Sequence, residues 1–179
     1  MESNDERIYI SLDLQSPILN AKMPNNVCWY ILNKQERENS PHFWQYTINK
    51  SWSFLSVYNE QVPWNEQLDT NHIFKFINDG NDINILFQEH DLIGWAWQNK
   101  KMADSVPLKK HQIYQSRWLI DKKFLFKKSN KGLSLWWIQE LKKYYRKEGF
   151  AQGVAYIDDW NKGALKSVLR AGYEIKKWN

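Results

Sequence analysis

The pattern of apolar positions in the first half of the chain predicts two short strands and two helices. Residues 7–14 alternate in part between apolar and polar, and residues 27–32 form an apolar, aromatic run, as strands do. A helix is expected from Ser40-Pro41, because Ser suits the N-cap and Pro the first helical position. A second, shorter helix covers residues 71–78 and ends at Asp79-Gly80.

The pattern after residue 80 begins with strands. Residues 83–88 and 92–98 flank Glu89-His90-Asp91 and predict a hairpin. Residues 113–126 predict a further strand region, which is expected to be broken or bulged because it exceeds the usual strand length.

The last part of the chain alternates helices with strands. Helices are expected at 132–148 and 161–171, and strands at 152–157 and 173–178. On the long helix the predicted apolar face consists of Leu133, Trp137, Leu141 and Tyr144. Strands that alternate with helices predict an α/β (α+β) fold whose sheet has mixed strand directions.

Composition favours one soluble globular domain. The chain has 179 residues, of which 42% are hydrophobic and 25% charged, and Cys28 is its only cysteine, which excludes an intrachain disulfide. No apolar run approaches the roughly 20 residues of a membrane span, and the acidic start is unlike a signal peptide, so we expect a cytoplasmic protein. All seven glycines follow residue 79. We therefore expect a single domain over 1–179, with a variable half over about 1–80 and a more regular half over about 81–179.

The net charge of +5, with eleven Trp and nine Tyr, allows a nucleic-acid partner. The lysines, however, mostly flank apolar runs and form no single basic tract, and the tryptophans lie inside apolar patterns that predict core packing. A phosphorylated cofactor accounts for part of the positive charge. Nucleic acid stays possible as an acceptor and is not favoured as the sole ligand.

The most informative segment is the loop of residues 127–134, which follows a strand-like run and leads into the long helix. The first amides of a helix have no intrahelical partner, and the helix dipole adds partial positive charge there. Gly132 allows a ligand to approach the backbone closely, and Lys127, Lys128 and Lys131 add formal charge. The segment therefore predicts a site for phosphate groups, such as a pyrophosphate.

The order of motifs over about residues 83–178 resembles the GNAT superfamily of acetyl-CoA-dependent N-acetyltransferases. The phosphate loop of that family reads roughly Gln/Arg-x-x-Gly-x-Gly/Ala, and residues 129–134 fall on it. Its second hallmark is an Asn, a small residue three positions on, and a helix that closes in Gly-Phe; Asn161, Ala164 and Gly172-Tyr173 take those places. Ser129 and Ser134 depart from the family pattern.

The resemblance implies a mostly antiparallel sheet that splays at the cofactor site, with helices on both faces, and acetyl-CoA or CoA as the cofactor. It also implies that residues 123–126 form the strand along which the pantetheine arm lies. The residues expected to bind the cofactor are Phe124, Leu125, Phe126, Lys127, Ser129, Asn130, Lys131, Gly132, Leu133, Ser134 and Asn161.

Acyl transfer to an amine needs a base, for which Asp121, Glu89 and Asp91 are candidates, with Asp121 favoured because it precedes the cofactor segment. The family often places a proton-donating Tyr where this chain has Val168. Tyr173 is the candidate acid, with Ser167, Tyr156 or water as substitutes. The four histidines show no metal-ligand spacing, so no metal is expected.

The acceptor is expected at the helix over 40–60 and the loop over 99–110, where His42, Trp44 and Trp52, together with Phe43 and Trp64, are candidate binding residues. An unknown small amine is predicted. An aromatic cleft could take an amino sugar, an aryl amine or an amino-acid derivative, and an amino sugar or amino-acid derivative is slightly favoured. The alternatives are a catalytically weak CoA-binding module, suggested by Ser129 and Val168, and an RNA-directed acetyltransferase.

The last predicted strand, over 173–178, would leave an exposed sheet edge that includes Trp178. We expect this edge to be covered by the N-terminal strand of the same chain or by a second copy in a homodimer.

Overall fold

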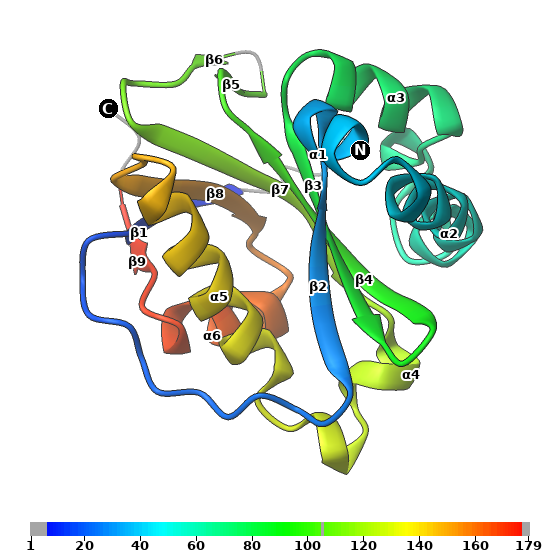
Figure 1. The fold of residues 1–179 in the computed structure, drawn as a ribbon. Helices are drawn as coiled ribbons and strands as arrows, with labels where there is room; N and C mark the ends of the chain where they lie inside the picture. Colours follow the sequence, from blue (N-terminus) through cyan, green and yellow to red (C-terminus); the bar gives the residue numbers. More distant parts are fainter. Residues whose placement is uncertain (1–6, 105, 177–179) are drawn as a thin grey trace. The chain divides into compact units, whose positions relative to one another are not determined.

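The computed structural model describes residues 7–104 and 106–176 (Figure 1). One sheet has the strand order β2-β3-β4-β7-β8-β1-β9. Its strands are β1 (Arg7–Asp13), β2 (Val27–Leu32), β3 (Asp82–Gln88), β4 (Asp91–Asn99), β7 (Gln112–Ile120), β8 (Gln152–Asp158) and β9 (Glu174–Ile175). The pairings β1–β8, β1–β9, β2–β3 and β3–β4 are antiparallel, and β7–β8 is parallel. The predicted mixed α/β fold with a mostly antiparallel sheet is confirmed.

The remaining elements are helices and one small hairpin. The hairpin pairs β5 (Met102–Ala103) with β6 (Val106–Pro107). The α-helices of the described residues are α1 (Lys34–Asn39), α2 (Pro41–Asn59), α3 (Thr70–Asn78), α4 (Lys122–Leu125), α5 (Leu133–Lys147) and α6 (Lys162–Arg170). Two 3₁₀ turns, η1 (Trp64–Glu66) and η2 (Lys128–Asn130), complete the order. None of these helices combines the length and the apolar character needed to cross a membrane.

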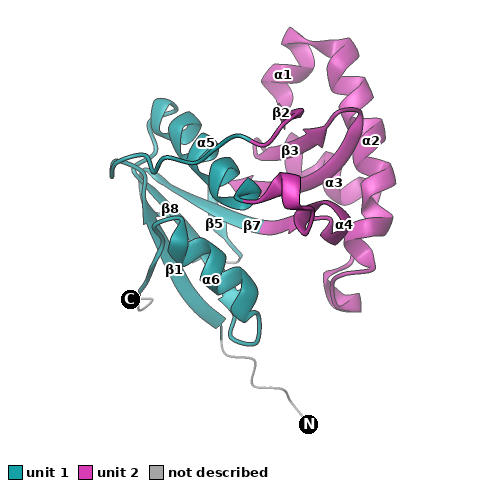
Figure 2. Cartoon of the chain, turned by 90° about the horizontal axis from the view of Figure 1, so that it is seen from below, with its two compact units in different colours: residues 1–23, 100–116, 132–179 teal, residues 24–99, 117–131 magenta. Residues whose placement is uncertain are grey.

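The chain forms two compact units, coloured separately in Figure 2. Unit 1 contains residues 1–23, 100–116 and 132–179, and unit 2 contains residues 24–99 and 117–131. The units do not follow the division near residue 80 that the sequence suggested. The reason is that hairpin β3–β4 shares its core with helices α2 and α3 and so belongs with them in unit 2.

Aromatic side chains dominate the core of unit 2. Trp95 of β4 is fully buried, and the rings of Phe54 and Tyr58 from α2 lie 5.1 and 5.2 Å from it. Trp97 follows on the same face of β4, with its ring 5.7 Å from that of Trp95. The Trp97 ring lies 4.5 Å from that of Phe76 in α3, so two tryptophans two residues apart on one strand form the floor on which α2 and α3 pack.

Helix α2 begins at Pro41 after Ser40, as predicted, although Ser40 makes no side-chain capping bond. The helix before it, α1, was not predicted, because its sequence Lys-Gln-Glu-Arg-Glu-Asn has no apolar periodicity. Its signal is Asn33, whose side chain accepts a hydrogen bond from the N–H of Glu36 at 2.8 Å.

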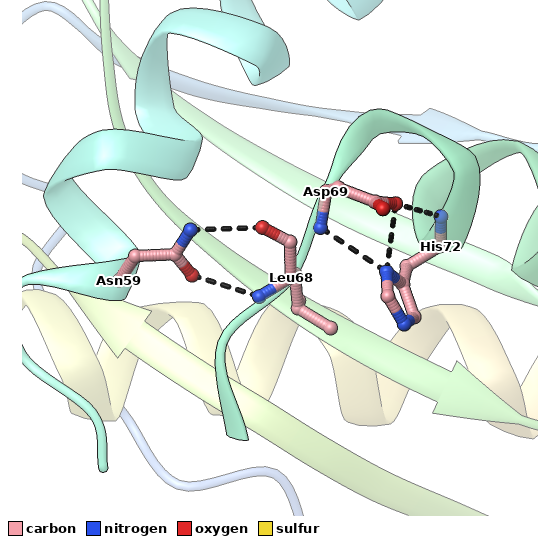
Figure 3. Close-up of polar contacts among 4 residues, drawn as sticks. All are labelled: Asn59, Leu68, Asp69 and His72. Carbon is pink, nitrogen blue, oxygen red and sulfur yellow. Dashed lines mark hydrogen bonds and ion pairs between the residues drawn. The ribbon is translucent and has the colours of Figure 1, made fainter. Parts of the chain in front are cut away.

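Paired polar contacts join α2 to α3 (Figure 3). The Asn59 side chain donates to the carbonyl of Leu68 at 2.8 Å and accepts from its N–H at 2.9 Å. Asp69 then caps α3 by accepting from the N–H of His72 at 3.0 Å, and the Asp69 N–H donates to the His72 ring at 3.1 Å. These bonds satisfy backbone groups that the turn would otherwise leave unpaired.

In unit 1, β1 lies between β8 and β9. Seven residues of β1 pair with β8, and Ile10 and Ser11 pair with β9. The N-terminal strand thus pairs with the C-terminal one, as expected, but β9 is short and is the last strand in the sheet order, so among the described residues its outer edge has no partner strand. Trp178, part of the same prediction, lies outside the described residues.

Helix α5 buries Leu133, Trp137 and Leu141 as predicted, but Tyr145 is buried more deeply than Tyr144. Lys142 is also buried, and its ammonium donates to the hydroxyl of Ser16 and to the carbonyl of Pro17. Burial lowers the pKa of Lys142, and the charge of Arg146 lowers it further. Through Lys142 and Arg146, α5 thus forms hydrogen bonds with the segment that follows β1.

Gly94 of β4 provides the first test, because a Cβ there would lie 2.7 Å from the carbonyl oxygen of Leu119 and 3.2 Å from the Cα of Ile120. Gly94→Ala should lower the free energy of unfolding by about 1–3 kcal/mol, since backbone atoms must shift. Urea denaturation measures the change. Gly163→Ala in α6 is the control, since nothing lies within 4 Å of a Cβ there, and it should leave stability unchanged or raise it by up to about 1 kcal/mol. Equal effects of the two substitutions would contradict the close approach.

Candidate active site

Strand β7 carries the most unusual backbone near the predicted cofactor site. Its parallel pairing with β8 runs over Gln112–Tyr114, and the strand continues to Ile120. Within it Arg117 has a left-handed backbone (φ 48°), which is rare for a residue with a side chain and typical of a bulge. The guanidinium of Arg117 lies 5.3 Å from the ring centroid of Trp97, and this contact holds the residue in place. The predicted irregularity of this strand region is confirmed, whereas nothing in the sequence pointed to Arg117.

Residues 123–126 do not form the predicted strand. Strand β7 ends at Ile120, and helix α4 follows, because the Asp121 carboxylate accepts a hydrogen bond from the N–H of Lys123 at 2.9 Å. Phe124 and Leu125 are partly buried on this helix, and Phe126 is exposed. The sequence signal for this turn was Asp121, because an Asp side chain can accept a hydrogen bond from a nearby backbone N–H and so favours a turn over a continued strand.

Asp121 therefore has a structural role that differs from the one predicted. It is only 9% exposed, its carboxylate caps α4, and its N–H donates to the carbonyl of Ile93 at 2.8 Å. The capping bond uses one oxygen of the carboxylate, Oδ1, and the role of Asp121 as a base stays a prediction.

The first part of the predicted phosphate loop belongs to unit 2. Lys127, Lys128, Ser129 and Lys131 are exposed, whereas Asn130 is buried. The Asn130 amide exchanges two 3.0 Å hydrogen bonds with the Gln88 amide and donates a third to the carbonyl of Phe124 at 2.9 Å. The side chain of Asn130 thus fixes the loop to the end of β3, and a contact of Asn130 with a cofactor stays a prediction.

The second part of the loop is the start of α5 in unit 1. Gly132 has φ 87°, a conformation that suits Gly, and no side chain caps the helix that follows. Open space lies above Gly132, since nothing is within 4 Å of an added Cβ. Leu133 is buried, and Ser134 is partly exposed. The first amides of α5 therefore form an uncapped helix N-terminus of the kind that binds anions.

Asn161 caps α6, as its position after β8 predicted. Its side-chain oxygen accepts from the N–H of Ala164 at 3.1 Å. A contact of Asn161 with a cofactor stays a prediction.

Tyr173 does not have the surroundings of a catalytic acid. It is 5% exposed, and its hydroxyl donates to the side-chain oxygen of Gln115, while Gly153 of β8 lies beside it. Burial raises the pKa of Tyr173. A hydroxyl that is enclosed and already bonded stabilises unit 1, and the assignment of Tyr173 as the acid stays a prediction.

Unit 2 contains a pocket of about 360 Å³ at the turn between β3 and β4. The residues that line it are Cys28, Phe43, Tyr46, Phe87, Glu89 and His90. Glu89, one of the predicted bases, is therefore next to a cavity. Of the aromatic residues expected at the acceptor site, only Phe43 lines this pocket.

The other predicted acceptor residues lie elsewhere on α2. Trp44 is 4% exposed and donates from its indole to the carbonyl of Asn33, so it belongs to the core. Trp52 packs edge-on against Phe74, with ring centroids 6.0 Å apart, and His42 is exposed. The sequence signal that could have predicted the pocket is the pair Phe43 and Tyr46. These two aromatic residues lie three positions apart, on the face of α2 away from Trp44.

No family model matches the sequence, and no curated protein does. Solved structures match in fold, and three of them cover most of this chain. A GCN5-related N-acetyltransferase from Sphaerobacter thermophilus is 10% identical, with a TM-score of 0.58 over 95% of this chain. The yncA protein of Salmonella typhimurium, described with its cofactor acetyl-CoA, is 14% identical, with a TM-score of 0.59 over 86%. An aminoglycoside acetyltransferase from an uncultured soil metagenomic sample, in complex with trehalose, is 16% identical, with a TM-score of 0.57 over 88%.

The chain has the GNAT fold. It spans 48% of the Sphaerobacter protein, 82% of the Salmonella protein and 95% of the metagenomic one.

Asn130 allows a test of how the loop is held. Asn130→Ala should lower the free energy of unfolding by about 2–3 kcal/mol, because the Gln88 amide and the Phe124 carbonyl lose buried partners. Ser129→Ala, at the exposed neighbour, should change stability by less than about 0.5 kcal/mol. Urea denaturation of both variants measures the difference, and similar values would show that Asn130 does not anchor the loop.

Tyr173 predicts how stability depends on pH. The unfolded phenol ionises near pH 10, and the folded one at a higher pH, so its contribution is present below pH 10 and lost above it. The loss should approach about 1.4 kcal/mol per pH unit. Urea denaturation between pH 8 and pH 11 should therefore give a shallower decline for Tyr173→Phe than for the wild type. A decline of equal steepness in the two proteins would rule out this contribution.

Proposed function

We propose that the protein is an acetyl-CoA-dependent N-acyltransferase that moves an acetyl group to the primary amine of a small acceptor. The observation that carries this proposal is the path of the backbone from β7 to α5. A strand with a left-handed residue, Arg117, leads through a lysine-rich loop into a helix with no side-chain cap. By the family resemblance we expect this path to form the cofactor site, with β7 as the cofactor strand and the loop over 127–131 as the phosphate loop. The yncA protein, which shares the fold, is described with acetyl-CoA.

The pyrophosphate of the cofactor would bind the first amides of α5, where Gly132 leaves open space. Lys127 and Lys131, both exposed, would supply the formal charge that Ser129 lacks. The pantetheine arm would pair with the backbone of β7 beyond Tyr114, and the residues first expected for this role, 123–126, would flank it. Asn161 would contact the arm from α6, in addition to its role as a cap.

The acetyl group reaches the site as an activated thioester, which is the chemistry that the cofactor supplies. The acceptor arrives as an ammonium ion and must lose a proton before its nitrogen can form the new C–N bond. Glu89 is the candidate to accept that proton, directly or through water, because it lines a pocket. A backbone N–H of β7 near Arg117 would donate to the carbonyl oxygen of the acetyl group. The C–S bond would then break and the nitrogen would release its second proton to solvent. The departing thiolate would take a proton from solvent, since Tyr173 is enclosed.

Contacts within unit 2 support placing the acceptor near the cofactor loop. Gln88, the last residue of β3, holds Asn130 of the loop, and Glu89 is the next residue along the chain. The N–H of Asp121, at the end of β7, donates to the carbonyl of Ile93 in β4. The end of β7, the first part of the loop and the pocket therefore lie at the same end of this unit. A small amine acceptor is consistent with the neighbour that is named an aminoglycoside acetyltransferase.

Cofactor binding is tested by Gly132→Val. The substitution places a β-branched side chain at φ 87° over the amides that would hold the pyrophosphate, so acetyl-CoA affinity should fall at least about tenfold by calorimetry. Gly149→Val is the matched control, because Gly149 has φ 88°, equally open space, and a position at the other end of α5. It should cost similar stability and leave the affinity intact. Equal acetyl-CoA affinities of the two variants would refute the assignment.

Turnover is measured as thiol release from acetyl-CoA with a panel of primary amines. An N-acyltransferase should release thiol in an amine-dependent way. Binding of acetyl-CoA without amine-dependent release would favour the alternative of a CoA-binding module.

A further inference from the structure

The pocket of unit 2 has a composition that selects among amines. Its floor is a cross-strand pair, Cys28 of β2 opposite Phe87 of β3. Its wall is the face of α2 that carries Phe43 and Tyr46. Its rim is the turn between β3 and β4, with Glu89 and His90. The floor and the wall thus come from three different elements of one compact unit.

The aromatic rings of the pocket are held in place by one another. Phe43 and Tyr46 stack at 5.9 Å with an angle of 21°, and Tyr46 and Phe87 stack at 6.1 Å with an angle of 25°. Tyr30 meets Phe43 edge-on at 4.6 Å. The Tyr46 hydroxyl donates to the carbonyl of His90 at 3.3 Å, which joins the wall to the rim. Because each ring packs against another, the rings form a fixed, flat surface for a ligand.

The polar groups at the pocket are few, and one of them is an acid. Glu89 has a left-handed backbone (φ 57°), and its N–H donates to the carbonyl of Asn26 at 2.9 Å. These two features fix the position of the Glu89 backbone in the turn. Lys50 already lies over the ring of Tyr46, at 5.7 Å. The Glu89 carboxylate accepts one long hydrogen bond, from the Asn26 side-chain amide to Oε1 at 3.4 Å, which leaves its second oxygen for a ligand ammonium.

We propose that this pocket binds an aryl-alkyl primary amine, with its ring against Phe43, Tyr46 and Phe87 and its ammonium at Glu89. A volume of about 360 Å³ is at the lower end of ligand pockets and suits one aromatic ring with a short chain. An amino sugar carries hydroxyl groups around its ring, and each loses affinity where it is buried without a partner. The mostly aromatic lining therefore selects against the sugar that the sequence slightly favoured. The amine's role as an acetyl acceptor rests on the proposed function, whereas its binding does not.

Cys28 supplies the test, because it is the only cysteine of the chain, is exposed, and lines the pocket. The rate at which a disulfide reagent labels Cys28 is measured without acetyl-CoA, in the presence of tyramine, 2-phenylethylamine, 3-phenylpropionate or glucosamine. The two aryl-alkyl amines should slow labelling at least about fivefold at saturation. The acid of the same shape and the amino sugar should not slow it.

Substitutions assign the two halves of the ligand. Phe43→Ala and Glu89→Gln should each weaken tyramine protection about tenfold, through the ring and the charge respectively. Trp52→Ala is the matched control on the same helix, with 39% exposure against 44% for Phe43, and Glu60→Gln is the control for charge. Both controls should leave protection unchanged. Calorimetric titration with tyramine gives a second measurement that does not depend on the reactivity of Cys28.

The outcomes separate this proposal from the one before it. Unchanged labelling together with no calorimetric heat from tyramine would overturn the pocket assignment, even if acetyl-CoA binds and is turned over with other amines. Equal protection by glucosamine would overturn the substrate class. Protection by tyramine in a protein that does not bind acetyl-CoA would support the pocket while the N-acyltransferase assignment fails.

Discussion

Strands β4 and β7 approach each other so closely at Gly94 that the backbone itself fills the space where a side chain would lie. This contact fixes where β7 ends, because the next bond along it, from the N–H of Asp121 to the carbonyl of Ile93, is the last before the chain turns. Asp121 then caps α4, and the chain enters the loop over 127–131. The position of the candidate cofactor loop within unit 2 thus follows from one steric constraint between two strands.

A second constraint, the buried amide pair Asn130 and Gln88, joins that loop to the β3–β4 hairpin. Side-chain amides can both donate and accept, so two of them facing each other satisfy each other without charge. The same hairpin carries Glu89 and the rim of the aromatic pocket. The loop and the pocket are therefore both attached to the β3–β4 hairpin. This shared attachment is a physical reason to propose that cofactor and acceptor bind near each other.

In unit 1 polar residues have a mainly structural role. Lys142 and Arg146 of α5 hold the segment after β1, and Tyr173 is enclosed with Gln115. Two of these residues, Lys142 and Tyr173, have pKa values shifted by burial in the direction that favours the neutral form. The largest cause of both shifts is burial, which follows from how the side chains pack in unit 1.

The sequence by itself determined most of the elements and their order. The apolar periodicity and the cap residues predicted β1, β2, the β3–β4 hairpin, α2, α3, α5 and α6, since these signals act over a few residues. The starts of α5 and α6, directly after Gly132 and Asn161, were predicted for the same reason. Tertiary structure alone decided which polar residues are available for chemistry. Asp121, Asn130 and Tyr173 were chosen for their types and positions, and each proved to have a bonded partner that is local in space but not always in sequence. The pocket likewise needs Cys28, Phe43, Phe87 and Glu89 from three segments, and only packing of α2 on the sheet brings them together, because no short-range pattern encodes which face of a helix meets a strand.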